Sequence, residues 1–119
     1  MLLNLSHKNL KAWQLSKQLQ SEVRTITKQL PKDEEFVLRI QIRRAALSVL
    51  NNIAEGAARK TNAEKRRFYE ISRSSLVEVD TDFEAMLELG YVKENEIEKT
   101  GKMLNEIFAM LSGMMTKLS

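Results

Sequence analysis

Apolar residues recur every three or four positions along most of the chain, which is the spacing of one face of an α-helix. This pattern predicts four helices, over about residues 8–30, 34–58, 62–89 and from 94 onward. Few residues belong to hairpin turns, and the connections are short, so consecutive helices should run antiparallel. We therefore expect an all-α, antiparallel up-down-up-down four-helix bundle that forms a single domain over residues 1–119.

Residues near the expected helix ends support these bounds. Pro31 ends the first helix because proline cannot continue one, and Asp33 is expected to cap the second. Residues 61–64 read Thr-Asn-Ala-Glu, the pattern of a capping box, and start the third helix. Gly90 suits the position just beyond that helix. Gly113 weakens the fourth helix, so we expect fraying after it.

The second helix carries two stripes on its surface. Its apolar positions are Leu38, Ile42, Ala45, Ala46, Val49 and Ile53, continued by Phe36, Ile40, Leu47, Leu50 and Ala54. Its polar positions are Gln41, Arg44, Ser48, Asn51, Asn52, Glu55 and Arg59. The apolar arc is wider than one partner helix needs. We expect that the other three helices do not cover it and that copies of the protein associate. Gly56, near the end, would let another backbone approach closely.

Composition limits the class of protein. The chain has no cysteine, which excludes disulfides and thiolate metal sites and is typical of the cytoplasm. The first eight residues, MLLNLSHK, are too short for the core of a signal peptide. No apolar run approaches the roughly 18 residues that span a bilayer. We expect a cytoplasmic protein with no membrane partner.

The formal net charge of +3 conceals an asymmetry. Residues 39–73 carry nine basic and three acidic groups, a net of +6, whereas residues 74–119 carry four basic and nine acidic groups, a net of −5. Two interpretations stay open. The basic segment attracts a polyanion, or the two segments meet each other within the fold or between subunits.

Several short motifs resemble a known family. Residues 10–13 read LKAW, residues 30–34 read LPKDE, and residues 41–56 read QIRRAALSVLNNIAEG, followed by Arg59. Arg67-Phe68 and residues 74–78 add weaker matches. The pattern resembles the small four-helix-bundle proteins encoded in intervening sequences of bacterial 23S ribosomal RNA genes.

The resemblance covers roughly residues 10–92, and it departs from the family at Ser74, where glycine is usual. It implies a bundle that assembles into a ring, a homopentamer, without known catalytic activity. Related accessory proteins of retroelements form basic rings that are thought to work with a reverse transcriptase and nucleic acid. The implied partners are therefore other copies of the chain, RNA or DNA, and a reverse transcriptase or other protein.

One polar cluster of the second helix lies at helical spacing. Arg44, Ser48, Asn52 and Glu55 share a face, and either Glu55 or Glu78 could pair with the arginine. The cluster is either a ligand or RNA site, or a structural network that sets how the second helix meets the third helix or another subunit. No member is a nucleophile beside a base, so we nominate no catalytic residue and no enzyme activity.

A basic cluster surrounds the turn between the second and third helices. Its members are Arg59, Lys60, Lys65, Arg66, Arg67 and Arg73. They are either a nucleic-acid-binding surface, repeated around a ring, or a solvated helix start. The chain's tryptophan and phenylalanines fall on apolar stripes, so the sequence gives no stacking platform for bases.

An acidic run in the third helix comprises Glu78, Asp80, Asp82 and Glu84. Di-iron bundles also need Glu-x-x-His pairs, and the one histidine, His7, lies far from this run, so we expect no metal site and no cofactor. Two hypotheses remain. The protein is a ring that binds RNA or DNA, or it is an adaptor for a larger protein with no nucleic-acid binding.

Overall fold

The computed structural model describes residues 2–118, apart from the side chain of Glu35. Short turns precede the first and second helices. The elements are a 3-10 turn η1 (Ser6–Asn9), α1 (Lys11–Thr27), a 3-10 turn η2 (Lys32–Glu34), a π-helical turn η3 (Glu35–Arg39), α2 (Ile40–Ala58), α3 (Asn62–Glu88) and α4 (Glu94–Lys117). Residues 2–118 contain no strand, so the all-α class is confirmed.

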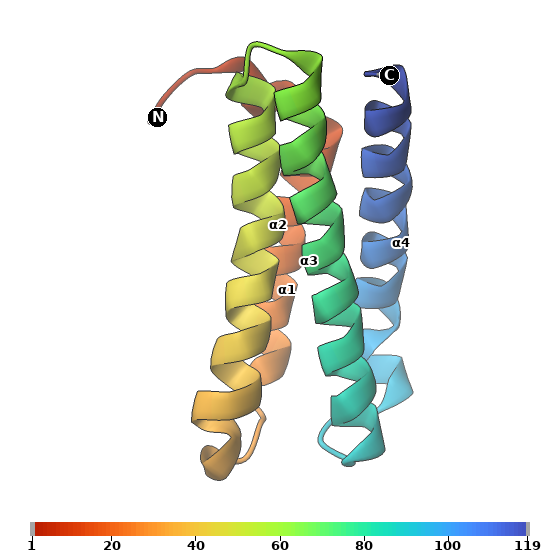
Figure 1. Cartoon of the computed structure of the whole chain (residues 1–119). Helices are drawn as coiled ribbons and strands as arrows, with labels where there is room; N and C mark the ends of the chain where they lie inside the picture. Colours follow the sequence, from red (N-terminus) through yellow and green to blue (C-terminus); the bar gives the residue numbers. More distant parts are fainter. Residues whose placement is uncertain (1, 119) are drawn as a thin grey trace.

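In Figure 1 the ribbon runs down α1, up α2, down α3 and up α4, and both chain ends lie near the turn between α2 and α3. Contacts join α1 to α2, α2 to α3, α3 to α4 and α4 back to α1, and the α2–α3 contact is the most extensive. The helices therefore surround one common core. No helix within residues 2–118 is long and apolar enough to cross a membrane.

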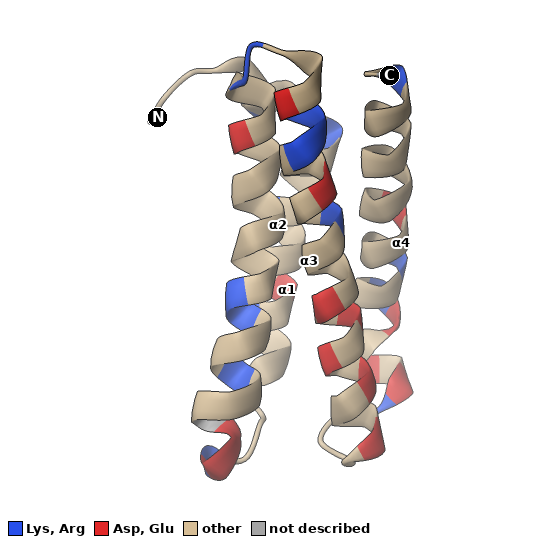
Figure 2. Ribbon diagram, viewed as in Figure 1, with Lys and Arg blue, Asp and Glu red and all other residues tan. Residues whose placement is uncertain are grey.

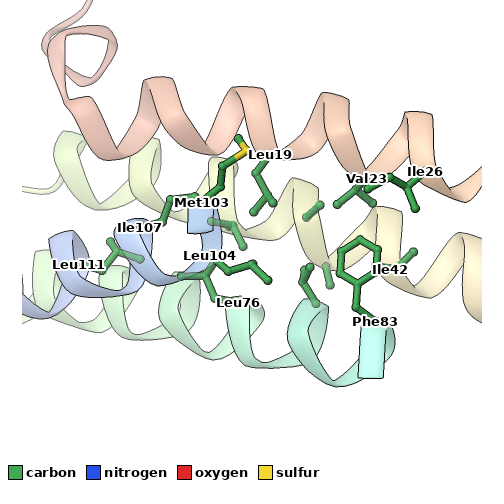
Figure 3. Packing of buried hydrophobic residues seen from close by; sticks show 14 of the residues in the cluster. Leu19, Val23, Ile26, Ile42, Leu76, Phe83, Met103, Leu104, Ile107 and Leu111 are labelled. Carbon is green, nitrogen blue, oxygen red and sulfur yellow. The ribbon is translucent and has the colours of Figure 1, made fainter. Parts of the chain in front are cut away.

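The core is built from the apolar stripes of all four helices. Leu19 and Val23 of α1 meet Ile42 of α2 and Leu76 of α3, and all are at most 2 % exposed. Figure 3 shows these side chains pointing inward together with Met103, Leu104, Ile107 and Leu111 of α4. Burial of this apolar surface is the main stabilising term of the fold.

We expected that the other three helices do not cover the apolar arc of the second helix. This expectation is wrong for most of α2. Leu38, Ile42, Val49 and Ile53 are 8 %, 0 %, 0 % and 0 % exposed within a single chain. The arc is exposed at its beginning, at Phe36 and Ile40, and it is half-buried at Leu47, Leu50 and Ala54. The reason for the burial is that α1 and α3 pack against α2.

Two of the expected helix ends are confirmed. Thr61 Oγ1 accepts a hydrogen bond from the Glu64 backbone N–H at 3.2 Å, so Thr61 is the N-cap of α3 as expected. The Glu64 carboxylate returns to the Thr61 hydroxyl, at 3.0 Å, where a full capping box would have it at the Thr61 backbone N–H. Gly90 has a φ of +77°. Beyond it, the Tyr91 N–H donates to Met86 O at 2.9 Å, which closes the end of α3 as a Schellman motif.

The expected Asp33 cap is wrong. Asp33 lies inside η2, and the residue that precedes the π-helical turn, Glu34, makes no side-chain cap. Arginines order this connection instead. Arg39 donates from Nε to Thr27 O at 3.0 Å and from its guanidinium to Leu30 O at 2.9 Å. These long-range bonds satisfy carbonyls at the end of α1, which needs partners there.

The expected fraying after Gly113 is also wrong, since α4 continues to Lys117. Met115 is 6 % exposed and Leu118 packs against the core, so tertiary burial outweighs the low helix propensity of glycine. The Thr116 hydroxyl also donates to Ser112 O at 3.0 Å inside the last turns.

Candidate nucleic-acid interface

The six basic residues singled out in the sequence do not form one surface. They begin at the end of α2 and continue about three turns into α3, but their side chains go to three different places. Arg59 and Lys65 close the end of α2, Arg73 turns toward α4, and Lys60, Arg66 and Arg67 are exposed. Figure 2 shows this basic stretch of α3 followed by an acidic one toward the far end of the helix.

Arg59 and Lys65 act on the carbonyl end of α2. Lys65 Nζ donates to Ala57 O at 2.9 Å and lies 3.5 Å from Gly56 O. Arg59 pairs with the Glu55 carboxylate at 2.9 Å, and its guanidinium lies 5.2 Å from the centre of the Phe68 ring. Cations at a helix C-terminus oppose the partial negative charge of the last carbonyls. Both side chains therefore have structural partners.

Arg73 joins α3 to α4. It donates to the Ser112 hydroxyl at 3.0 Å, and its guanidinium lies 5.3 Å from the centre of the Phe108 ring. Phe108 was expected in the core, but it is 41 % exposed and forms the surface on which this guanidinium rests. Arg73 is thus separated from Lys60, Arg66 and Arg67.

Arg66 and Arg67 border a hollow of about 630 Å³ between α2 and α3. Glu70 and Glu78 lie in the same hollow, so its charge is mixed. Ser74, which replaces the usual glycine of the resembling family, also lines it and is exposed. Its side chain therefore faces open surface and is not pressed between helices of this chain.

A second hollow of about 800 Å³ continues along the same two helices, because Ser48, Ser75 and Glu78 line both. We call the two hollows together the α2–α3 groove. At the far end of the groove three apolar side chains are exposed. They are Phe36, Val37 and Ile40, which are 79 %, 58 % and 41 % exposed. Phe36, expected on a buried stripe, therefore lies on the surface.

The predicted polar cluster contributes to this groove only in part. The Ser48 and Ser75 hydroxyls share a hydrogen bond at 2.7 Å, and Asn52 Nδ2 donates to Ser48 O at 2.8 Å and to its Oγ at 3.0 Å. Glu55 pairs with Arg59 and not with Arg44. Arg44 and Glu78 face the same hollow as exposed groups. The neutral members join α2 to α3, and the charged ones border the open surface.

Sequence reasoning missed a buried carboxyl beneath the groove. Asp82 is 5 % exposed, and its Oδ1 accepts a hydrogen bond from Gln41 Nε2 at 2.8 Å. Its Oδ2 is buried without a hydrogen-bond partner among the described residues. Burial raises the pKa of Asp82, the Gln41 bond lowers it, and the charge of Glu78 raises it, for a net increase.

A spacing signal could have located this contact. Gln41 and Ser48 are seven residues apart in α2, and Ser75 and Asp82 are seven apart in α3. Seven residues are about two helical turns, so each pair shares a face. In antiparallel helices the Ser48–Ser75 contact therefore places Gln41 opposite Asp82.

The acidic run does not gather into a metal site. Across residues 2–118, no group of three or more His, Asp or Glu side chains is arranged to hold a metal ion. Glu78, Asp80 and Glu84 are exposed along α3, while Asp82 points toward α2. The four residues therefore belong to different surroundings although they are close in sequence.

A model of the 23S rRNA-intervening sequence protein family matches residues 8–113, which is most of the chain. The chain belongs to this family. A comparison with curated proteins finds no match. In this intervening-sequence protein, residues 41–56, which carried the resemblance, lie wholly within α2.

Their polar members Gln41, Ser48 and Asn52 take part in the bonds along the α2–α3 contact described above. Gly56 is buried at the tightest point of that contact, since a Cβ there would lie 2.6 Å from Tyr69 Cε1 and 3.2 Å from Lys65 O. The expected close approach at this glycine is confirmed, and a side chain takes part as well as a backbone.

Proposed function

We propose that this intervening-sequence protein is a non-enzymatic, cytoplasmic assembly protein that binds RNA or DNA. Its chain forms an up-down-up-down bundle, and copies associate into a ring, the pentamer that the family resemblance implies. Lys60, Arg66 and Arg67 supply the nucleic-acid surface of each copy. The observation that carries the proposal is that these three cations are exposed at the turn between α2 and α3 and at the start of α3, while Arg59, Lys65 and Arg73 hold structural contacts.

Assembly into a ring strengthens the binding of a polyanion without any new kind of contact. Each copy repeats the same three charges, so a polyanion meets them many times. Phosphate contacts of this kind release counterions, and log K falls with log salt concentration by about 0.7 per contact for single strands. The binding should therefore be tight at low salt and weak at high salt, with little sequence preference.

The part of the α2–α3 groove that lies next to Phe36 is the surface by which copies meet in this proposal, whereas the part that Arg66 and Arg67 border stays open to nucleic acid. The first part combines the exposed apolar Phe36, Val37 and Ile40 with the cation Arg44. The α3–α4 face offers a match, because exposed Val77 and Phe108 lie there beside Asp80. Contact between two different surfaces is heterologous and closes into a ring when the rotation allows.

A salt titration with labelled single-stranded RNA tests nucleic-acid binding. The variant Lys60→Gln/Arg66→Gln/Arg67→Gln should weaken binding and reduce the salt slope by up to about 2. The matched control Lys28→Gln/Lys32→Gln/Lys117→Gln removes the same charge from exposed positions elsewhere and should retain the wild-type slope. Equal slopes for the two triple variants would show that this surface does not hold the nucleic acid.

Sedimentation velocity tests the assembly. A ring has a mass that is a multiple of the 13.7 kDa subunit, and Phe36→Ser/Ile40→Ser should shift it toward the subunit. Val77→Ser should have the same direction of effect on the opposite surface. A wild-type protein that sediments as one subunit at micromolar concentration would remove the ring.

A second function is favoured by the same apolar side chains. The high exposure of Phe36, at 79 %, also suits an adaptor that binds a larger protein such as a reverse transcriptase and has no nucleic-acid role. The salt titration and the sedimentation experiment separate the candidates. An adaptor would show no salt-dependent RNA retention. The Phe36→Ser variant of an adaptor would sediment, in the absence of its partner, with the same mass as the wild-type protein.

A further inference from the structure

A third hollow, of about 660 Å³, lies on the opposite side of the bundle between α1 and α4. We call it the Trp13 hollow. Its lining includes Lys8 of η1, Trp13, Gln14 and Lys17 of α1, and Lys99 and Met103 of α4. Its volume is within the range of small-molecule sites. It extends along α1 from Trp13 to Glu22, nearly three turns of helix.

Trp13 forms an aromatic surface that the hollow exposes. The indole is half-buried and packs against the core, so one part of it is anchored. The His7 ring lies edge-on to it, with ring centres 5.2 Å apart. Lys17 Nζ lies 5.5 Å from the indole centre. The sequence suggested that this tryptophan was only a core residue, and the structure places it at a surface.

Cations from three elements line the hollow that holds the indole. Lys8, Lys17 and Lys99 all line the hollow, and the acid among its lining residues is Glu22, which pairs with Lys99 at 3.3 Å. The side chain of Gln14 donates to Lys8 O at 2.9 Å, which holds η1 against α1. The hollow therefore has excess positive charge beside an aromatic face. That combination recognises an aromatic ring that carries a phosphate.

One end of the hollow lies at the same end of the bundle as the proposed nucleic-acid surface. η1 packs against both α1 and α2, and α2 leads directly into the turn that carries Lys60. Figure 1 shows the N-terminal segment and that turn at the same end of the bundle. A strand whose phosphates contact Lys60 therefore has the Trp13 hollow at the same end of the bundle.

We propose that the Trp13 hollow binds a nucleobase by stacking on the indole, with the adjoining phosphate held by Lys17 and Lys99. This inference rests on the proposed function, which supplies the nucleic acid. A free nucleotide and a base in a single strand share this chemistry. The base displaces Lys17 from the indole face, because the contact of a lysine with an exposed ring is the weaker of the two and is worth only about 2- to 5-fold in affinity. Stacking of a base is worth about 5- to 150-fold.

The first experiment uses the protein's own fluorescence. Trp13 is the single tryptophan of the chain, so its emission reports this hollow alone. Titration of the wild-type protein at low salt with an oligoadenylate of about ten nucleotides should quench the emission to saturation. Adenosine monophosphate is the second probe. Quenching by both at similar concentrations identifies a nucleotide site, and quenching by the oligomer alone identifies a single-strand site.

The second experiment measures affinity for a fluorescently labelled form of the same oligomer by anisotropy. Trp13→Leu should lose about 5- to 150-fold, and Trp13→Phe should lose less because it keeps a smaller ring. Lys17→Gln should lose about 2- to 5-fold, whereas the control Lys28→Gln, an exposed lysine at the other end of α1 and outside the hollow, should not change. Circular dichroism of each variant checks that it folds.

Failure of this inference is distinguishable from failure of the proposed function. Anisotropy binding without any quenching of Trp13 would overturn the stacking site and leave the surface of Lys60, Arg66 and Arg67 standing. Quenching by polyglutamate as strong as that by the oligomer would also overturn it, since the hollow would then accept any polyanion. No binding in either experiment would remove both proposals.

Discussion

The two halves of the α2–α3 pair are closed in different ways. Near the connecting turn, Gly56 lets the Tyr69 ring lie against the α2 backbone, and the Ser72 hydroxyl donates to Val49 O at 2.7 Å. Near the other end, the contact between the helices includes a carboxyl, Asp82, with one of its oxygens unpartnered among the described residues. Phe36 is exposed beside that end.

We call the half of the α2–α3 pair near the connecting turn the closed half, and the half near Phe36 the open half. In the closed half the polar groups are paired within one chain, whereas in the open half a carboxyl oxygen is unpartnered among the described residues and apolar side chains are exposed. Small residues and neutral hydroxyls bring the helices together with their polar groups satisfied. A buried carboxylate and exposed apolar side chains both raise the free energy of an isolated subunit. The open half is therefore where another molecule would gain most by covering the bundle, and the following changes test this division.

The largest difference should come from matched isoleucines in the two halves. Ile53 is 0 % exposed in the closed half, whereas Ile40 is 41 % exposed in the open one. Ile53→Ala should lower the free energy of unfolding by about 2–5 kcal/mol, because it leaves a cavity. Ile40→Ala should cost under about 1 kcal/mol at protein concentrations where subunits are separate. Urea unfolding followed by circular dichroism measures both, and equal losses would refute the division.

Glycine substitutions should give the next largest difference. Gly56→Ala forces the added Cβ against the Tyr69 ring and Lys65 O, and overpacking of this kind costs about 1–3 kcal/mol. A gain of about 1 kcal/mol in helix propensity offsets part of that cost. Gly101→Ala is the control, since no atom lies within 4 Å of its added Cβ, and it should stabilise the protein by about 1 kcal/mol. Two stabilised variants would show that the contact at Gly56 relaxes easily.

The serine pair of the α2–α3 contact should have a smaller effect. Ser48→Ala removes the 2.7 Å bond to Ser75 and should cost about 1 kcal/mol. In a double-mutant cycle with Ser75→Ala, the coupling should be about 0.5–1.5 kcal/mol. Strictly additive losses would mean that the two hydroxyls act independently.

The smallest effect should be a change in how the free energy of unfolding depends on pH when Asp82 is replaced. Burial raises its pKa in the folded protein above the usual 3.8, so the folded state favours the protonated form. The resulting stabilisation is present below about pH 3.8 and is lost as the pH rises through the folded-state pKa. Asp82→Asn should therefore gain stability relative to wild type between about pH 4 and pH 7. Urea unfolding at several pH values measures this difference. If the free energies of unfolding of Asp82→Asn and wild type changed in parallel across this range, the result would contradict a buried carboxyl at position 82.

Local signals in the sequence were enough to locate most of the fold. The N-cap at Thr61 and the glycine at position 90 depend on neighbouring residues only, and both are confirmed. The inner stripe of α2 follows from helical spacing. The π-helical turn could not be predicted, because Arg39 stabilises that connection by reaching back to Thr27 and Leu30 of the preceding segment. Such bonds depend on how the helices already pack.

The candidate site was predicted as a set of charges but not as a geometry. Arg66 and Arg73 are seven residues apart and share a face of α3 by spacing, yet only Arg73 is bound to α4. The difference arises because Arg73 lies opposite Ser112, and two turns earlier α4 has reached its end at Lys117. Helix length, which local spacing does not report, thus decides which arginine stays exposed. The same holds for Trp13, whose exposure depends on how η1 and α4 pack around it.

The π-helical turn Glu35–Arg39 has a consequence for changes in chain length. A π turn holds one residue more than the α turn it replaces, so it acts as a built-in insertion at the start of α2. Removal of a single residue there would convert the turn to ordinary α geometry and would rotate only the short stretch before it. The connection next to Phe36 can therefore become one residue shorter, while the side chains of α2 from Ile40 onward keep their positions in the core.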